Sequence, residues 1–315
     1  MKPPASTARL REALGIEMPI LGAPMARIAG GRLATAVSMS GALGFLGGGY
    51  GDLDWIDVEL AGIDVSTIGV GLITWKLDEQ PTVLDAVLGR GPRAVWLSYG
   101  DPASYIGTIH AAGAAAVCQV LDTESAVAAC DAGADVVVVQ GSEAGGHGRP
   151  GRSLITLLPA VIERVAHVPV VAAGGIATGR QLAACWQLGA AGVALGTRLY
   201  ATTEALDTDA AKAKLVELRG DETIHTTVFD IVRGPRWPEG YTGRAAANSL
   251  VRRWHHAVDA LEADLSRQRY RYGAAVDADD LDTRVLWAGE GVDLIDSIDP
   301  ARTLIDAIHR DALHA

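Results

Sequence analysis

The sequence predicts an α/β fold, a TIM (β/α)8 barrel with a C-terminal cap inserted after the last barrel strand. Short apolar runs alternate with helix-length segments from residue 19 to about residue 200. The strand-like runs number eight, and some, such as 136–139, are apolar at every position, as in parallel strands covered on both faces. An open doubly wound sheet is the alternative that the same periodicity allows.

The predicted elements follow one another in a regular order. The strands are expected at 20–23, 43–46, 68–73, 94–98, 115–120, 135–140, 168–172 and 192–195. Helices are expected between them, for example at 31–40, 80–89, 102–112, 123–132, 157–167 and 178–188. Two of these helices carry start and stop signals, Thr123 with Gly133 and Thr178 with Gly189.

The pattern changes after Tyr200, which predicts three regions. Residues 1–205 form the barrel core, and residues 206–295 form a charge-richer cap that shapes the substrate side. Within the cap, an irregular stretch at 233–244 precedes a predicted helix over 245–268. Residues 296–315 hold a helix over 300–313 that returns to the barrel.

Composition limits the classes of protein to which the chain can belong. Its 315 residues are 49% hydrophobic and 21% charged, which suits a globular protein with a large core. With 27 basic and 38 acidic residues the net charge is −11, and an acidic surface argues against nucleic acid or an anionic membrane as partner. A small-molecule substrate is therefore the expected partner, and self-association into a homo-oligomer stays open.

Cysteine usage and hydropathy bear on the compartment. The three cysteines, Cys118, Cys130 and Cys185, are too few and too scattered for a disulfide framework or a zinc site, so no metal is expected. None of them is placed to act as a nucleophile. The N-terminus has no uninterrupted apolar signal core, and no run of about 18 apolar residues occurs. We expect a cytoplasmic protein.

Two glycine-containing loops predict a phosphate site. The seventh strand ends in Gly174, Gly175 and Ile176, and the eighth ends in Gly196 and Thr197. In a barrel these loops lie side by side, and their uncovered N–H groups, the Thr197 hydroxyl and the helix starting near residue 178 can bind a phosphate monoester. No Walker lysine and no dinucleotide fingerprint accompanies them. Glycines that only make tight turns are the alternative.

His147 is the candidate general base. It follows the sixth strand within the segment GSEAGGHG (141–148), where nothing bulky nearby in the sequence restricts access. An imidazole takes up a proton near neutral pH, as a general base must. Glu143 either orients His147 or is solvated. Five aromatic residues could wall the pocket or simply pack in core and lid: Trp75, Trp96, Tyr99, Trp237 and Tyr241.

Five segments in order resemble the nitronate monooxygenase family, formerly called 2-nitropropane dioxygenases. They are GAPM (22–25), GALGFLGGGY (41–50), VVVVQGSEAGGHG (136–148), PVVAAGGIATGR (169–180) and GVALGTRLYAT (192–202). The resemblance covers roughly residues 15–250. It implies a flavoprotein oxidoreductase, a TIM barrel that binds FMN non-covalently.

The resemblance also implies roles for individual residues. His147 matches the catalytic histidine. The implied flavin contacts are Ala23, Pro24 and Met25 after the first strand, Thr74 after the third, Gln119 on the fifth, and Gly141 and Gly145 beside the ring. Gly174, Gly175, Gly196 and Thr197 would hold the phosphate. At 69–81 the chain departs from many members of the family, so Thr74 carries less weight.

The activity implied is oxidation of an alkyl nitronate by O2 to a carbonyl compound and nitrite, with the flavin as electron acceptor. A neutral nitroalkane must first lose an α-proton, and His147 is the expected base. Two alternatives stay open on the same barrel: an NAD(P)H-dependent reductase of quinones or enoyl thioesters, and a flavin-binding protein without turnover. An inosine-phosphate dehydrogenase type of barrel lacks the loop cysteine that it would need here.

Overall fold

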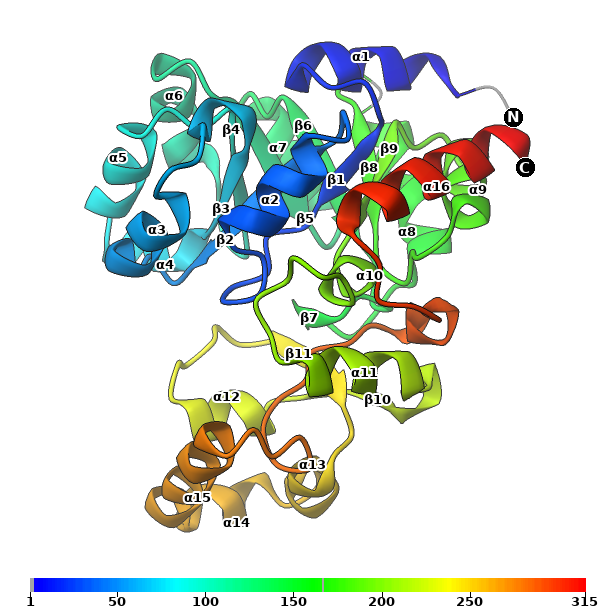
Figure 1. Cartoon of the computed structure of the whole chain (residues 1–315). Coiled ribbons are helices and arrows are strands. Elements are labelled where there is room, and N and C mark those ends of the chain that lie inside the picture. Colours follow the sequence, from blue (N-terminus) through cyan, green and yellow to red (C-terminus); the bar gives the residue numbers. More distant parts are fainter. Residues whose placement is uncertain (1–2, 166) are drawn as a thin grey trace.

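The computed structural model describes residues 3–165 and 167–315, and it contains the predicted barrel (Figure 1). Eight parallel strands close in the order β1-β2-β3-β4-β5-β6-β8-β9, and the register of β1 on β9, Ile20 opposite Val193, completes the ring. An open sheet is thereby excluded. The strands are β1 (Ile20–Gly22), β2 (Leu43–Gly49), β3 (Gly69–Ile73), β4 (Ala94–Ser98), β5 (Ala115–Val120), β6 (Val136–Gln140), β8 (Val170–Ala173) and β9 (Gly192–Leu195).

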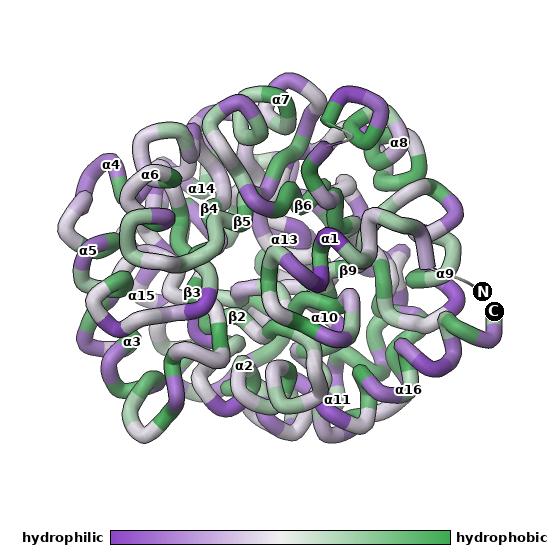
Figure 2. Tube along the Cα trace, turned by 90° about the horizontal axis from the view of Figure 1, so that it is seen from above, coloured by the Kyte–Doolittle hydropathy of each residue, from purple (hydrophilic) through white to green (hydrophobic). Residues whose placement is uncertain are grey.

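Helices surround the strands, as the view from above shows (Figure 2). The predicted start at Thr178 is confirmed: its hydroxyl and the Gln181 side chain form a reciprocal capping box at the first turn of α9. The predicted C-terminal helix is confirmed as α16, which packs against α9 and α2. The helices are α2 (Gly31–Ser38), α3 (Leu53–Leu60), α4 (Thr74–Glu79), α5 (Thr82–Leu88), α6 (Ala103–Ala111), α7 (Thr123–Asp131), α8 (Leu154–Arg164), α9 (Gly179–Gln187), α10 (Thr197–Tyr200) and α16 (Ala301–His314).

The barrel interior is closed at its amino-terminal end by α1 (Ala5–Leu14), which lies across that end in Figure 1. Leu10 and Leu14 of this helix are buried among side chains from the strands. Phe45 and Trp96 meet edge to face in the same cluster, with ring centroids 5.1 Å apart. Because these side chains fill the barrel interior at this end, a ligand cannot enter the barrel there.

Truncation of the floor of the barrel should destabilise the fold. Leu10 is fully buried, so Leu10→Ala is expected to cost about 2–5 kcal/mol of unfolding free energy through lost contacts and a residual cavity. Leu294→Ala is the matched control, because that side chain is 47% exposed. Urea unfolding of the two variants and the parent protein measures both effects. Equal midpoints for the two variants would contradict this account of α1.

The cap differs from its prediction. The prediction of a single helix over 245–268 is wrong. Ala245 and Ala246 are the last two residues of strand β11 (Thr242–Ala246), which pairs antiparallel with β10 (Thr223–Thr226). Asn248 then caps a new helix by accepting a hydrogen bond from the Val251 N–H. Strand pairing therefore overrides the helical propensity of the alanines. The cap helices are α11 (Asp209–Glu217), α12 (Val228–Arg233), α13 (Ser249–Trp254), α14 (Val258–Ala263) and α15 (Leu265–Asp277).

The cap lies against the carboxyl ends of the barrel strands (Figure 1). It has a hydrophobic cluster of its own, which includes Phe229, Trp254 and Tyr272. A three-stranded sheet joins the two parts, because β7 (Gly146–Gly148), which follows barrel strand β6, pairs with β11 of the cap. Among the residues described, no helix is long and apolar enough to cross a bilayer.

Candidate active site

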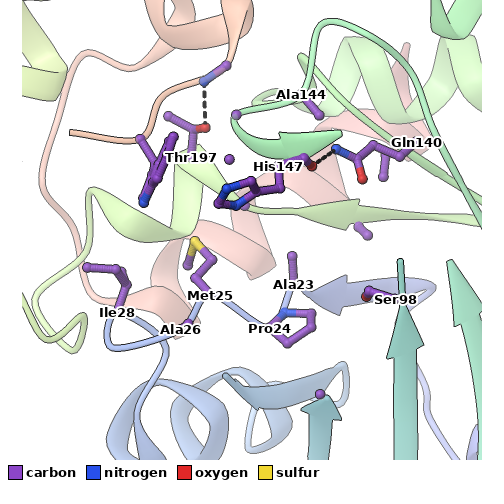
Figure 3. Close-up of a pocket in the computed structure, with 18 of the residues that line it drawn as sticks. Ala23, Pro24, Met25, Ala26, Ile28, Ser98, Gln140, Ala144, His147 and Thr197 are labelled. Atoms are coloured by element: carbon purple, nitrogen blue, oxygen red, sulfur yellow. Dashed lines mark hydrogen bonds between the residues drawn. The ribbon is translucent and has the colours of Figure 1, made fainter. Parts of the chain in front are cut away.

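One cavity opens where the barrel strands end and the cap begins (Figure 3). Most of the predicted site residues line it: Ala23, Pro24, Met25, Gln119, Gly145, His147, Gly174, Gly175, Gly196 and Thr197. The structure places two elsewhere. Thr74 is buried beside the cavity with no hydrogen-bond partner for its hydroxyl. Gly141 packs under the loop, where a Cβ would lie 2.6 Å from the Leu154 nitrogen.

The loops after β8 and β9 present a group of free donors. No hydrogen-bond acceptor lies against the backbone N–H groups of Gly174, Gly175, Ile176 and Gly196 in the part of the chain that the structure describes. The Thr197 hydroxyl accepts a hydrogen bond from the Gly289 N–H at 3.0 Å and keeps its own hydrogen for a ligand. Gly174 and Gly175 have φ angles of 117° and 67°, which favour glycine. This donor set fits a phosphate monoester.

The opposite part of the cavity has an apolar wall and a polar one. Pro24 packs directly on Gly71, where a Cβ would lie 2.2 Å from the proline ring. In the polar part of the lining, the Gln119 side-chain oxygen accepts hydrogen bonds from the Trp96 indole and the Ser98 hydroxyl, both at 3.2 Å. The Gln119 amide donates in turn to the Gln140 side chain. A lining that combines apolar contacts with fixed amide groups suits a flat, partly polar ring such as a flavin.

Hydrogen bonds fix both the backbone carbonyl and the imidazole ring of His147. Its carbonyl oxygen accepts hydrogen bonds from the Gln140 amide at 2.8 Å and from the Tyr99 hydroxyl at 2.9 Å. Tyr99 has a φ of 64°, rare for a residue other than glycine, and burial raises the pKa of its phenol to about 12, which keeps it a donor. The His147 Nε2 atom lies 2.9 Å from Oδ1 of Asp230.

His147 is less accessible than its sequence neighbours predict. The expectation that nothing bulky restricts access is wrong, because the Trp237 indole from the cap stacks on the imidazole, with centroids 3.6 Å apart. Only 10% of the His147 side chain is exposed. The restriction comes from a residue 90 positions away, so a local stretch of sequence carries no sign of it.

Several cap and loop residues at the site were missed by sequence reasoning. Asp230 and Arg233 come from α12, and Tyr50 follows β2. Asp230 lies 83 positions from His147, and no motif joins them. Glu143 neither orients His147 nor stands free in solvent: both of its oxygens lie 2.9 Å from the Leu154 N–H and cap α8.

The predicted aromatic residues form a wall with one exception. Tyr50, Trp75 and Tyr99 contact the Trp237 ring edge to face, and Tyr241 contacts it at a tilt. With the Tyr50–Trp75 and Tyr99–Tyr241 contacts, the ring centroids in this group lie 5.0–6.3 Å apart. Trp237 also donates a hydrogen bond to the Tyr50 hydroxyl at 3.0 Å. Trp96 is separate from this group: it packs against Phe45 inside the barrel and also lines the cavity, where its indole donates to Gln119. The cap thus places an aromatic surface over the cavity.

Neither a cysteine nucleophile nor a metal site is found near the cavity in the part of the chain that the structure describes. All three cysteines are buried, and burial raises the pKa of Cys118 and Cys185 to about 12 and of Cys130 to about 11, so none is a reactive thiolate. His255 lies against the Thr226 hydroxyl rather than sharing a ligand with His256. Within residues 3–165 and 167–315, no cluster of three or more His, Cys, Asp or Glu residues is arranged to hold a metal ion.

A TIM barrel with a donor cradle after its last two strands and a histidine at the cavity defines a barrel enzyme that binds a phosphate-bearing ligand. A family model described as nitronate monooxygenase matches residues 7–69 and 73–311. The chain belongs to the nitronate monooxygenase family.

Relatives and solved structures agree with this assignment. The chain is 31% identical to a nitronate monooxygenase of Neurospora crassa, over 93% of this chain and 88% of that protein. It is 34% identical to a hydroxy-methyl-oxo-octahydro-indene-carboxyl-CoA dehydrogenase of Mycobacterium tuberculosis, over 70% of this chain and 63% of the other. Similar solved structures are FabK from Thermotoga maritima (TM-score 0.82, 28% identity, 97% and 96% covered) and a nitroalkane oxidase from Streptomyces ansochromogenes (TM-score 0.80, 27% identity, 97% and 98% covered).

Proposed function

We propose that the protein is an FMN-dependent enzyme that oxidises alkyl nitronates with O2 to a carbonyl compound and nitrite, and that it also accepts neutral nitroalkanes, from which His147 removes the α-proton. The observation that carries this proposal is the buried contact between His147 and Asp230 at the cavity, since a phosphate cradle alone would serve any flavin-binding protein. FMN would supply the electron acceptor and the reaction with O2.

Each wall of the cavity has a part in this chemistry. The amides of Gly174, Gly175 and Gly196, with the Thr197 hydroxyl, would hold the phosphate. Residues 23–25 and the Gln119 amide would orient the ring. The aromatic wall around Trp237 would keep water from the reacting atoms and so strengthen polar contacts to the substrate.

Arg233 supports an anionic substrate. Its side chain lines the cavity, lies over the Trp287 ring at 5.7 Å and is 4.0 Å from Asp230, its nearest acidic group. A guanidinium beside a largely apolar cavity attracts a nitronate, which carries a full negative charge. A neutral quinone would gain hydrogen bonds from this group but no charge–charge attraction.

A reductase acting on a thioester is the second candidate, and the similarity to FabK and to a CoA-ester dehydrogenase favours it. Arg149, Lys76 and Arg27 contact Asp122, Glu79 and Asp52 in partly exposed ion pairs. Such pairs are weak enough to exchange for the phosphates of a CoA carrier, so these contacts do not decide between the two candidates.

Anaerobic mixing separates these activities. We expect the purified holoenzyme to lose its visible flavin absorbance within the stopped-flow time range when mixed with propionate-3-nitronate, and to keep it when mixed with NADH. Buffer without substrate is the control. Rapid bleaching by NADH alone would contradict the proposal in favour of a reductase, and a response to neither reagent would favour a flavin-binding protein without turnover.

A further inference from the structure

We propose that Asp230 is a positioning residue: it keeps a proton on Nε2 of His147 and so leaves Nδ1 as the atom that accepts the substrate proton. This inference rests on the proposed function, because it assigns the base by atom. In the step it serves, the C–H bond next to the nitro group breaks, the proton passes to Nδ1, and the electron pair enters the nitro group to give the nitronate.

The contact between the two side chains is short and shielded. Nε2 and Oδ1 lie 2.9 Å apart, and the exposed fractions of the two side chains are 10% for His147 and 7% for Asp230. An ionised carboxylate only accepts hydrogen bonds, so in a neutral imidazole the hydrogen must be on the nitrogen that faces it. The apolar faces of Trp237 and Trp287, stacked and tilted against the imidazole, keep water from competing.

The other ring nitrogen is left available. Nδ1 of His147 has no hydrogen-bond partner among the described residues, and it is not one of the fully buried atoms that lack a partner. His147 lines the cavity that also holds the cradle and the apolar wall. A neutral imidazole with hydrogen on Nε2 therefore offers its basic lone pair at Nδ1.

The buried carboxylate of Asp230 lowers the stability of the folded protein. Its Oδ2 atom is fully buried and has no hydrogen-bond partner, and the nearest cation, Arg233, approaches only Oδ1, at 4.0 Å. A buried carboxylate oxygen without a partner is destabilising, so packing alone does not account for an aspartate here. Its position is fixed by neighbours in the helix, since Phe229 and Val232 of α12 pack into the core of the cap.

The pair therefore joins the cap to the barrel. His147 lies on β7 next to the barrel, Asp230 lies on the cap helix α12, and β7 and β11 hold them together through the pairing of His147 with Gly243. His147 and Asp230 therefore come together only when the sheet between barrel and cap is formed. A residue that acts in this way should affect proton transfer and the tautomer rather than substrate binding.

The tautomer of His147 tests the inference without any turnover. In holoenzyme labelled with heavy nitrogen in histidine, long-range proton–nitrogen spectra should show His147 with hydrogen on Nε2 at neutral pH. In Asp230→Asn the amide can donate to Nε2, and the hydrogen should move to Nδ1. Asp282→Asn, which alters an exposed cap carboxylate bonded to Ser249, should leave the spectrum unchanged.

Kinetics give a second readout. Asp230→Asn is expected to lower kcat on nitroethane about 30-fold, part of the gain that a general base provides, with less than about threefold change on preformed ethyl nitronate. A wild-type protein with hydrogen on Nδ1, or an unchanged tautomer in a folded Asp230→Asn variant, overturns the inference. If the wild type turns over neither substrate, the proposed function fails while the tautomer still decides the role of Asp230.

Discussion

Replacing His147 by asparagine is expected to abolish activity on neutral nitroalkanes and largely to spare activity on preformed nitronates. Asparagine keeps a hydrogen-bonding group beside Asp230 but has no basic nitrogen, so the α-proton has no acceptor. A general base contributes about 100- to 10000-fold to a rate, and we expect a loss of about 1000-fold in kcat/KM on nitroethane. On ethyl nitronate the change should stay below about fivefold, because no deprotonation is needed.

Oxygen uptake and nitrite release, each measured with both substrates, separate these effects. His110→Asn is a matched control, because that histidine pairs with Asp135 and does not line the cavity. The flavin content of each variant must be equal for the comparison to hold. Equal losses on nitroethane and on its nitronate would rule out His147 as the base and would favour a role in binding both substrates.

The barrel and the cradle could be predicted from the sequence because both follow from local patterns. The run at 136–139 is apolar at every position since both faces of β6 are covered, and the predicted bounds of three strands, 94–98, 115–120 and 192–195, agree with the structure. The glycines after β8 and β9 meet because adjacent strands in a barrel end side by side.

The ring environment of His147 could not be predicted, for an equally physical reason. Trp237 and Asp230 reach it from a cap that is joined to the barrel by the pairing of β7 with β11, in which paired residues such as His147 and Gly243 lie 96 positions apart. Pairing at such separation leaves no periodic signal. The helix predicted over 245–268 failed for a different reason: the nearby strand β10 pairs with Ala245 and Ala246 and places them in a strand despite the helical propensity of alanine.

Gly196→Ala is expected to weaken the binding of FMN about 100-fold and to leave the fold intact. A Cβ at this position would lie 3.9 Å from the Ala23 side chain and 4.0 Å from the Met25 sulfur, which are ordinary contacts in the ligand-free protein. The added methyl group would enter the cavity next to the free N–H groups that should hold the phosphate. Loss of one or more hydrogen bonds to a charged phosphate corresponds to about 1.5–3 kcal/mol each, which is about 10- to 150-fold in Kd.

Riboflavin shows whether the loss concerns the phosphate. Titration of the apoprotein with FMN and with riboflavin should give a Kd for FMN that rises about 100-fold in Gly196→Ala and a Kd for riboflavin that changes less than about threefold. Gly107→Ala, on the outer helix α6 with nothing within 4 Å of the added carbon, should change neither. If both ligands weaken equally, the methyl group disturbs the ring site or the fold. If the wild type binds riboflavin as tightly as FMN, the glycine loops only make turns, and the phosphate must be held elsewhere.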